Sequence, residues 1–96
     1  MTIARVFEGK GWTTQQYDEL IGKLVAELGL DEGRSAPGVL FHWAAATDDG
    51  MRAIDVYASR EAADRLVQDH IGPIAGSLGL PLPEISEYEV HNFLTA

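Results

Sequence analysis

The sequence predicts an α+β fold, in which a four-stranded antiparallel sheet carries two helices on one face. Three observations support this prediction. The chain has 96 residues, the length of one domain. Its apolar residues recur at strand spacing in some segments and at helical spacing in others, and two apolar runs in its middle are joined by an Asp-Asp-Gly turn. A hydrophobic fraction of 46% against 23% charged residues favours a folded core, so residues 1–96 are expected to form a single domain.

The first third of the chain predicts a strand followed by a helix. Apolar and polar residues alternate over residues of about 2 to 8, which predicts a strand, and the glycines at positions 9 and 11 should end it. Thr13 is the expected N-cap of the helix, and Gln16 completes a capping box with it. Gly29 is expected to end the helix. The apolar stripe of this helix consists of Tyr17, Leu20, Ile21, Leu24 and Leu28.

The central segment, residues 39–58, predicts a β-hairpin and is reached through a loop from Leu30 to Gly38. Asp49 and Gly50 lie between apolar flanks and are a strong signal for a two-residue turn. Polar side chains interrupt both strands, although these strands otherwise have the composition of buried ones. Because buried polar groups need partners, the interruptions mark a candidate site.

The two-residue turn determines which side chains share a face of the hairpin. It places His42 opposite Tyr57 and Ala44 opposite Asp55. The three polar residues then share a face with small residues, which leaves room for a ligand. The small residues are Ala44, Ala46 and Ala53, and the opposite, apolar face holds Val39, Phe41, Trp43, Ala45, Ile54 and Val56. A three-residue turn would instead send His42 to the apolar face and bring Trp43 beside Asp55. The two-residue turn is preferred because it separates polar from apolar residues more cleanly.

The segment after the hairpin predicts a second helix. Ser59 is its expected N-cap. Gly72 and Pro73 should break or kink the helix, because proline cannot continue the backbone hydrogen bonds, and a short helical piece through Leu78 should follow. The apolar stripe of the helix consists of Ala63, Leu66, Val67, His70 and Ile71.

After an extended Pro-rich connector, residues of about 86 to 94 predict the last strand, with Asn92 on the helix side and His91 on the other. The resulting order, β-α-β-β-α-β, is that of a ferredoxin-like fold with both helices on one sheet face. The other face is apolar and bare. We therefore expect two copies to pack sheet against sheet as a homodimer, a dimeric α+β barrel.

The charge and cysteine content exclude several classes of partner. With 15 acidic and 7 Lys or Arg residues, the net charge is -8, which disfavours nucleic acid and anionic membranes. The chain has no cysteine, so disulfides, thiol nucleophiles and thiolate metal clusters are excluded, and no apolar run is long enough for a signal peptide or a membrane span. A soluble cytoplasmic protein is expected.

Three segments carry a resemblance to a known family. Residues 55–62, DVYASREA, combine an acidic residue, an aromatic residue and a serine-capped helix start, and the strands at 38–49 and 87–94 agree in position and character. The chain resembles the dimeric α+β barrel superfamily, and within it the small proteins related to the antibiotic biosynthesis monooxygenases. The resemblance implies a pocket between helices and sheet, which the monooxygenase members use to oxygenate electron-rich aromatic polyketides without metal or flavin. The superfamily also includes isomerases, dehydratases and haem enzymes.

The chain departs from that family at two positions. Leu66 stands where the monooxygenase-like members often have a histidine, although His70 follows one helical turn later. Relative to the haem-degrading branch, Gly76 replaces the iron-binding histidine and Leu66 a pocket tryptophan. The resemblance therefore implies no haem, and no cofactor is expected.

Four residues are the candidate catalytic groups. His42 is the expected general base, since an imidazole titrates near neutral pH. Tyr57 would donate a hydrogen bond to a developing oxyanion, while Asp55 would orient the histidine or join an ion pair at a dimer interface. His70 is the second candidate base. Each also has a purely structural interpretation, such as a buried His42 hydrogen-bonded to Tyr57.

The candidate ligand contacts are mainly aromatic. They are Trp12, Tyr17, Trp43, Leu66 and Asn92. The three histidines form no close cluster in the sequence, so no metal site is predicted. These expectations favour a small cofactor-independent enzyme of monooxygenase type acting on an aromatic or polyketide-type small molecule. The alternative is a non-catalytic homodimeric protein that binds a ligand or a partner.

Overall fold

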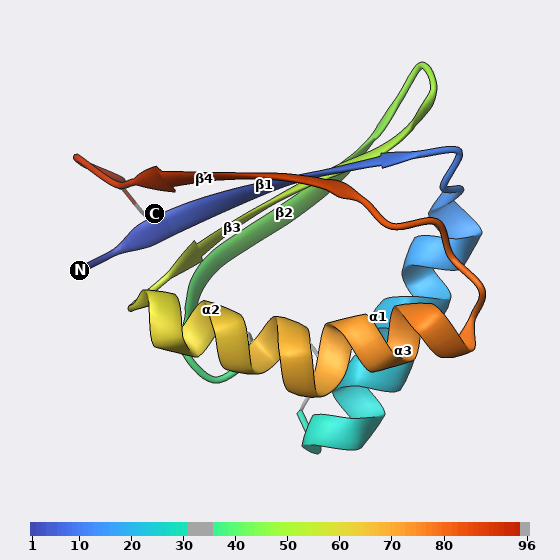
Figure 1. The fold of residues 1–96 in the computed structure, drawn as a ribbon, viewed down its shortest axis with the longest axis horizontal. Helices are drawn as coiled ribbons and strands as arrows, with labels where there is room; N and C mark the ends of the chain where they lie inside the picture. The colour runs from blue at the N-terminus through green and yellow to red at the C-terminus, as the bar shows by residue number, and fades with distance from the viewer. Residues whose placement is uncertain (31–35, 95–96) are drawn as a thin grey trace.

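The computed structural model describes residues 1–30 and 36–94, so part of the predicted loop at 30–38 lies outside the described residues. The elements are β1 (Ile3–Lys10), α1 (Thr14–Leu28), β2 (Val39–Thr47), β3 (Gly50–Tyr57), α2 (Arg60–Leu66), a π-helical turn η1 (Val67–Ile71), α3 (Gly72–Ser77) and β4 (Glu84–Glu89). The strands form one antiparallel sheet in the order β2-β3-β1-β4. Figure 1 shows the helices as a second layer on one side of this sheet. The predicted ferredoxin-like arrangement is confirmed.

The termini of α1 are those that the sequence predicts. The Thr13 hydroxyl accepts a hydrogen bond from the Gln16 backbone N–H at 3.1 Å, and the Gln16 side chain accepts one from the Thr13 N–H at 3.0 Å. Gly29 ends the helix with φ 65°, a left-handed conformation that glycine adopts without strain. Leu20 and Leu24 are buried toward the sheet side.

The hairpin turn lies one residue earlier than predicted. Thr47 pairs with Gly50, so Asp48 and Asp49 form the turn, and His42 lies opposite Asp55 instead of Tyr57. Gly50 belongs to the strand because β1 passes very close to it. A Cβ at Gly50 would lie 2.0 Å from the Gly9 carbonyl oxygen.

The loop still has two residues, so the assignment of side chains to faces is unchanged. Ala44 pairs with Ala53 instead of Asp55, yet His42, Asp55 and Tyr57 share one face as predicted, and the three-residue turn is excluded. A bulge between Val39 and Phe41 brings Val39 opposite Tyr57. Val39 consequently packs against the core and not on the outer face, where the sequence placed it.

The second helix does not stop at Gly72 and Pro73. It begins as predicted, with the Ser59 hydroxyl accepting from the Ala62 N–H at 3.1 Å. The chain then passes through the π-helical turn, in which the Gly72 N–H donates to the Val67 carbonyl, and continues as α3. Because Pro73 has no N–H to donate, the wider turn just before it lets the helix continue without a break.

Strand β4 begins and ends earlier than predicted. It covers Glu84–Glu89 instead of residues 86–94, so Asn92 and His91 lie beyond its end and are exposed. The reason is the length of its partner, because Glu89 already pairs with Ile3, the first residue of β1. At the other end, β1 itself runs to Lys10, which pairs with Gly50 of β3, so Gly9 does not end the strand as predicted.

The core lies between the sheet and the helices and contains Ile3, Leu20, Leu24, Tyr57, Ala63, Leu66, Ile74, Ala75 and Leu80. None of the described helices covers the outer sheet face. Phe41, Trp43 and Tyr88 are exposed on this face, Tyr88 to 58%. Among the described residues, no helix has the length and hydropathy needed to cross a membrane.

Candidate functional site

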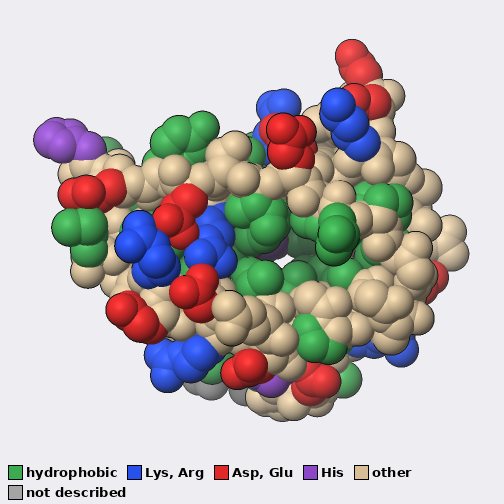
Figure 2. Space-filling view, in the orientation of Figure 1, with side chains coloured by type: hydrophobic (Ala, Val, Ile, Leu, Met, Phe, Trp, Pro, Cys, Tyr) green, Lys and Arg blue, Asp and Glu red, His purple; other side chains and the backbone are tan. Residues whose placement is uncertain are grey.

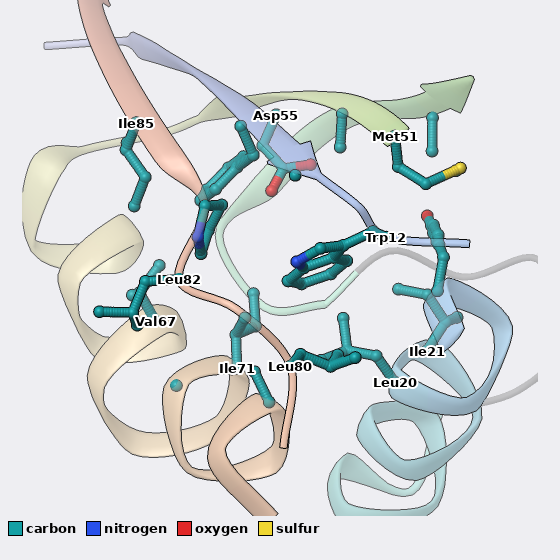
Figure 3. A pocket seen from close by; sticks show the side chains of 18 of the residues that line it. Trp12, Leu20, Ile21, Met51, Asp55, Val67, Ile71, Leu80, Leu82 and Ile85 are labelled. Carbon is teal, nitrogen blue, oxygen red and sulfur yellow. The ribbon is translucent and has the colours of Figure 1, made fainter. Parts of the chain in front are cut away.

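A cavity of about 380 Å³ lies between the inner sheet face and the helices. Figure 2 shows the hollow with hydrophobic side chains around it. In Figure 3, Met51, Asp55 and Ile85 reach it from the sheet, whereas Leu20, Ile71 and Leu80 close the opposite side. The volume lies within the range of about 300–1,000 Å³ that is typical of small-molecule sites.

The cavity exists because several residues around it are small. Ala44 and Ala53 face it from the hairpin, and Gly72 and Gly76 face it from the second helix. A Cβ placed on Gly76 would meet no atom within 4 Å. The alanine-lined hairpin face predicted from the sequence therefore borders the cavity, although Ala46 is not one of the residues that line it.

Trp12 lines the cavity and is hydrogen-bonded to the connector that leads to β4. Its indole Nε1 donates a hydrogen bond to the Pro81 carbonyl oxygen at 2.9 Å. The ring packs on Gly9, where a Cβ would come within 2.8 Å of the indole Cγ, so a larger residue would displace the tryptophan. Leu82, from the same connector, lines the cavity and is 94% exposed.

Four polar side chains form a continuous hydrogen-bonded chain at the sheet side of the cavity. The Tyr17 hydroxyl contacts Nε2 of His42, and Nδ1 of His42 contacts Oδ1 of Asp55. The Tyr57 hydroxyl donates to Oδ2 of the same carboxylate at 2.7 Å. This hydrogen-bonded chain therefore begins at α1, crosses from β2 to β3 and ends in the core.

The hydrogen-bond partners determine the tautomer of His42. A carboxylate can only accept, so the Nδ1 atom that contacts Asp55 carries the proton of a neutral imidazole. Nε2 is then the acceptor, and the Tyr17 hydroxyl donates to it. Asp55 is only 5% exposed and Tyr57 is fully buried, so the carboxylate replaces its lost hydration with these two hydrogen bonds.

Both tyrosines of this hydrogen-bonded chain are protonated at neutral pH, and burial raises their pKa values further. Desolvation, followed by the charges of Asp55 and Asp18, raises the pKa of Tyr17 to about 12. Desolvation also raises the pKa of Tyr57 well above its usual value, with further contributions from the Asp55 charge and hydrogen bond. At neutral pH both hydroxyls are therefore hydrogen-bond donors.

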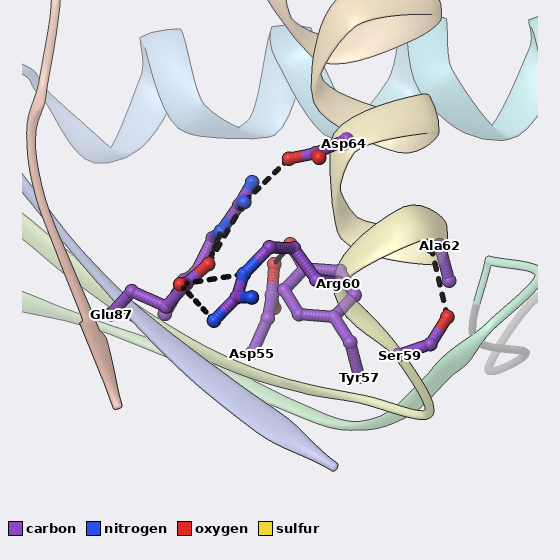
Figure 4. Close-up of polar contacts among 8 residues, drawn as sticks. Asp55, Tyr57, Ser59, Arg60, Ala62, Asp64 and Glu87 are labelled. Carbon is purple, nitrogen blue, oxygen red and sulfur yellow. Dashed lines mark hydrogen bonds and ion pairs between the residues drawn. The ribbon is translucent and has the colours of Figure 1, made fainter. Parts of the chain in front are cut away.

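Beside this hydrogen-bonded chain, a cluster of charged residues forms ion pairs between the sheet and the second helix. Arg5, opposite Asp55 on β1, forms ion pairs with Asp64 at 2.6 Å and with Glu87 at 3.0 Å. Arg60 joins through Glu87 at 2.9 Å (Figure 4). The hydrogen bond from Arg5 lowers the pKa of Glu87. The cluster links β1, β4 and α2.

The structure brings most of the predicted hairpin site together. His42 and Asp55 line the cavity, as do the predicted ligand contacts Trp12 and Tyr17. Tyr57 lies behind Asp55, so its hydroxyl contacts the carboxylate and not the cavity. The direct contact between Tyr17 and His42 was not predicted, since a register argument within the hairpin contains no information on the helix above it.

His70 does not join the cavity, although its place on the apolar stripe predicted that it would. Its Nδ1 lies 2.5 Å from Oε2 of Glu27 on α1. The prediction assumes the period of an α-helix, whereas the π-helical turn that contains His70 has more residues per turn, which rotates the side chain away from the cavity.

Three other predicted ligand contacts lie elsewhere. Trp43 is on the outer sheet face, because the hairpin loop has two residues. Leu66 is buried in the core, and Asn92 lies past the end of β4. In the part of the chain that the structure describes, no three His, Asp or Glu side chains are placed to hold a metal ion.

Known proteins resemble this chain in structure more clearly than in sequence. No protein-family model matches the chain. No curated protein matches it either. Among solved structures, the chain is similar to SnoaB, a cofactor-independent oxygenase from Streptomyces nogalater, with 19% identity and a TM-score of 0.61 over 99% of this chain and 96% of that one.

Two further solved structures agree with this result. A proposed antibiotic biosynthesis monooxygenase from Chloroflexus aurantiacus has 20% identity and a TM-score of 0.66, over 99% of this chain and 98% of that one. Another from Deinococcus radiodurans has 16% identity and a TM-score of 0.56, over 100% and 98% of the two chains. The chain thus has, over its whole length, the fold of proteins described as antibiotic biosynthesis monooxygenases.

Proposed function

We propose that the protein binds an aromatic or polyketide-type small molecule in the cavity and that His42 accepts a proton from it. The observation that carries this proposal is the placement of an imidazole, with Nδ1 held by a buried carboxylate, in the wall of an apolar cavity. A base held by a third group is the usual arrangement for proton abstraction. The similarity in fold to a cofactor-independent oxygenase supports the same role.

The reaction that follows proton removal is an oxygenation by dioxygen itself. Loss of a proton leaves the ligand as an electron-rich carbanion, which the apolar walls shield from water. Dioxygen forms a C–O bond at the deprotonated carbon, and the protonated hydroperoxide then loses water, so that one oxygen atom stays on the product. His42 returns its proton during this sequence and needs no cofactor to do so.

We further propose that the active form is a homodimer. The outer sheet face carries Phe41, Trp43 and Tyr88 as exposed aromatic side chains. A second copy packed sheet against sheet would remove them from water, and a two-fold axis lets the same face serve both copies. Sedimentation at micromolar concentration should detect a dimer, whereas a single species of the 10.4 kDa chain mass would contradict it.

A model reaction tests the base without knowledge of the natural ligand. The ring of 5-nitrobenzisoxazole opens when a base removes its one acidic C–H proton, and the coloured nitrophenolate product is easily measured. We expect saturable ring opening by the wild type and a loss on the order of 100-fold in His42→Ala. The matched control is His91→Ala, an exposed histidine beyond β4, which should keep the wild-type rate.

Oxygen uptake separates the oxygenase from its alternatives. With anthrone, a flat tricyclic compound with an acidic CH₂ group, the proposal predicts one dioxygen consumed for each anthraquinone formed. Ring opening of 5-nitrobenzisoxazole together with no oxygen uptake in the presence of anthrone would indicate a proton-transfer enzyme instead. Binding of anthrone with neither activity would favour the non-catalytic ligand-binding alternative.

A further inference from the structure

We infer that Tyr17 is the group that exchanges a proton with the ligand, and that His42 acts behind it as the final acceptor. This inference rests on the proposed function, because it assigns the path by which the proton reaches His42. It makes Tyr17 a catalytic residue, whereas the sequence marks it only as an aromatic ligand contact. It also separates two roles that a simple general-base mechanism gives to the histidine alone.

The first support is that the acceptor atom of His42 is already occupied. Nε2 accepts a hydrogen bond from Tyr17, and Nδ1 is held by Asp55, so both ring nitrogens have partners. A ligand could reach Nε2 directly only by displacing the tyrosine. Tyr17 itself lines the cavity, and its hydroxyl oxygen keeps a second lone pair that can accept a hydrogen bond.

The second support is that every hydrogen bond in this set of four side chains points toward Asp55. Tyr17 donates to His42, and His42 donates to Asp55, whose other oxygen accepts from Tyr57. A ligand that donates to the Tyr17 oxygen would extend this chain by one member without reversing any hydrogen bond. Chains of this kind polarise their members cooperatively, which favours movement of a proton along them.

The third support is that the other polar groups at the cavity are engaged elsewhere. Trp12 donates its N–H to the Pro81 carbonyl, and the Arg52 guanidinium contacts Glu8 at 2.6 Å. Both Asp55 oxygens are taken by His42 and Tyr57. Among the described residues that line the cavity, Tyr17 is therefore the side chain best placed to receive a proton from the ligand.

The transfer moves two protons and leaves Tyr17 unchanged. The ligand C–H or O–H proton passes to the Tyr17 oxygen while the Tyr17 hydroxyl proton passes to Nε2 of His42. The ligand becomes an anion and His42 an imidazolium, whose charge Asp55 balances. Burial disfavours a free tyrosinate, so the two transfers occur together and not through a charged Tyr17.

Solvent isotope effects test this path with 5-nitrobenzisoxazole as the probe. The C–H proton of the probe does not exchange with water, whereas the Tyr17 hydroxyl proton does. Transfer through Tyr17 therefore makes ring opening slower in D₂O on the plateau of the pH profile. Direct transfer from carbon to His42 moves no exchangeable proton, and the plateau rates in H₂O and D₂O would be equal.

Tyr17→Phe supplies the second measurement, because phenylalanine keeps the ring and removes the hydroxyl. We expect a rate loss of about 100-fold, similar to that of His42→Ala, and loss of the solvent isotope effect from the residual rate. The control is His91→Ala, at an exposed position beyond β4, which should keep both the rate and the isotope effect.

The outcomes distinguish this inference from the proposed function. Activity that depends on His42 but is unchanged or faster in Tyr17→Phe would show that the tyrosine only shields Nε2, which overturns the relay and leaves the base assignment intact. Equal plateau rates in H₂O and D₂O would have the same meaning. A wild type no more active than His42→Ala would overturn both.

Discussion

His42 and Asp55 lie directly opposite each other on neighbouring strands, and the imidazole Nδ1 contacts the carboxylate across the pair. Direct cross-strand neighbours are the closest side chains that a sheet offers, so the sheet itself holds the imidazole in place. The buried carboxylate would also stabilise the imidazolium that proton abstraction creates. This pair connects the fold to the proposed chemistry.

Removing the charge of Asp55 should impair proton abstraction more than binding. Asn in Asp55→Asn keeps a carbonyl that accepts from Nδ1–H but cannot balance an imidazolium. We expect ring opening of 5-nitrobenzisoxazole to fall about 100-fold or more, with little change in KM. Retained kcat with raised KM would contradict the role of Asp55 and assign it to binding.

Tyr57→Phe should destabilise the fold, because it leaves one oxygen of a buried carboxylate without its donor. The expected loss of unfolding free energy is about 1–3 kcal/mol, measured by urea denaturation. Nitrogen-15 spectra of the imidazole should also show more of the other tautomer, since Asp55 is free to rotate. The control variant His91→Ala, at an exposed position beyond β4, should change neither the unfolding free energy nor the tautomer of His42.

The raised pKa of Tyr17 predicts a specific loss of stability at alkaline pH. The folded-state pKa of about 12 lies above the unfolded value of 10, so the unfolded chain releases this proton first. The contribution of Tyr17 is therefore complete below pH 10 and is lost as the pH rises through about 12.

The measurement is the thermal midpoint of wild type and Tyr17→Phe across that pH range. The wild type should lose its advantage over the variant as the pH rises above 10, and only the wild type should show this component of the alkaline transition. A difference between the two proteins that stays constant from neutral pH upward would contradict the assigned pKa.

Filling the cavity should abolish ligand binding while preserving the fold. Gly76 lines the cavity and a Cβ placed on it would meet no atom within 4 Å, so the side chain of Gly76→Leu should occupy part of the cavity. Replacing a helical glycine also raises helix propensity by about 0.5–1 kcal/mol, which offsets some strain. Binding of anthrone, measured by fluorescence, is the readout.

The matched control for this experiment is Gly22→Leu. Gly22 is also helical and also has open space at its Cβ, but it lies on the exposed face of α1 away from the cavity. This variant should bind anthrone as the wild type does. Equal binding by both variants would show that anthrone binds elsewhere.

Features that depend on neighbouring residues were predictable from the sequence. The capping box of Thr13 and Gln16 and the glycine stop at Gly29 are made by residues close in the chain, so their pattern was sufficient. The face shared by His42 and Asp55 was predictable as well, because side chains alternate along a strand and a two-residue loop preserves that alternation.

Other features depend on contacts between distant segments. The close approach of Gly9 makes Gly50 a strand residue and moves the turn, while the length of β1 decides where β4 ends. Likewise, the π-helical turn before Pro73 rotates His70 toward Glu27 and away from the cavity. No local pattern contains these contacts, so the sequence-based positions were wrong by one or more residues.

By itself, the sequence determined the order of the strands and helices, their caps and the face on which the polar residues of the hairpin lie. These follow from local hydrogen bonding and from the periods of strand and helix. Only the tertiary structure decided that His42 and not His70 faces the cavity, and that Tyr17 covers Nε2 of His42. The reason is physical: these positions depend on how α1 and the π-helical turn pack on the sheet, and packing joins residues that are far apart in the chain.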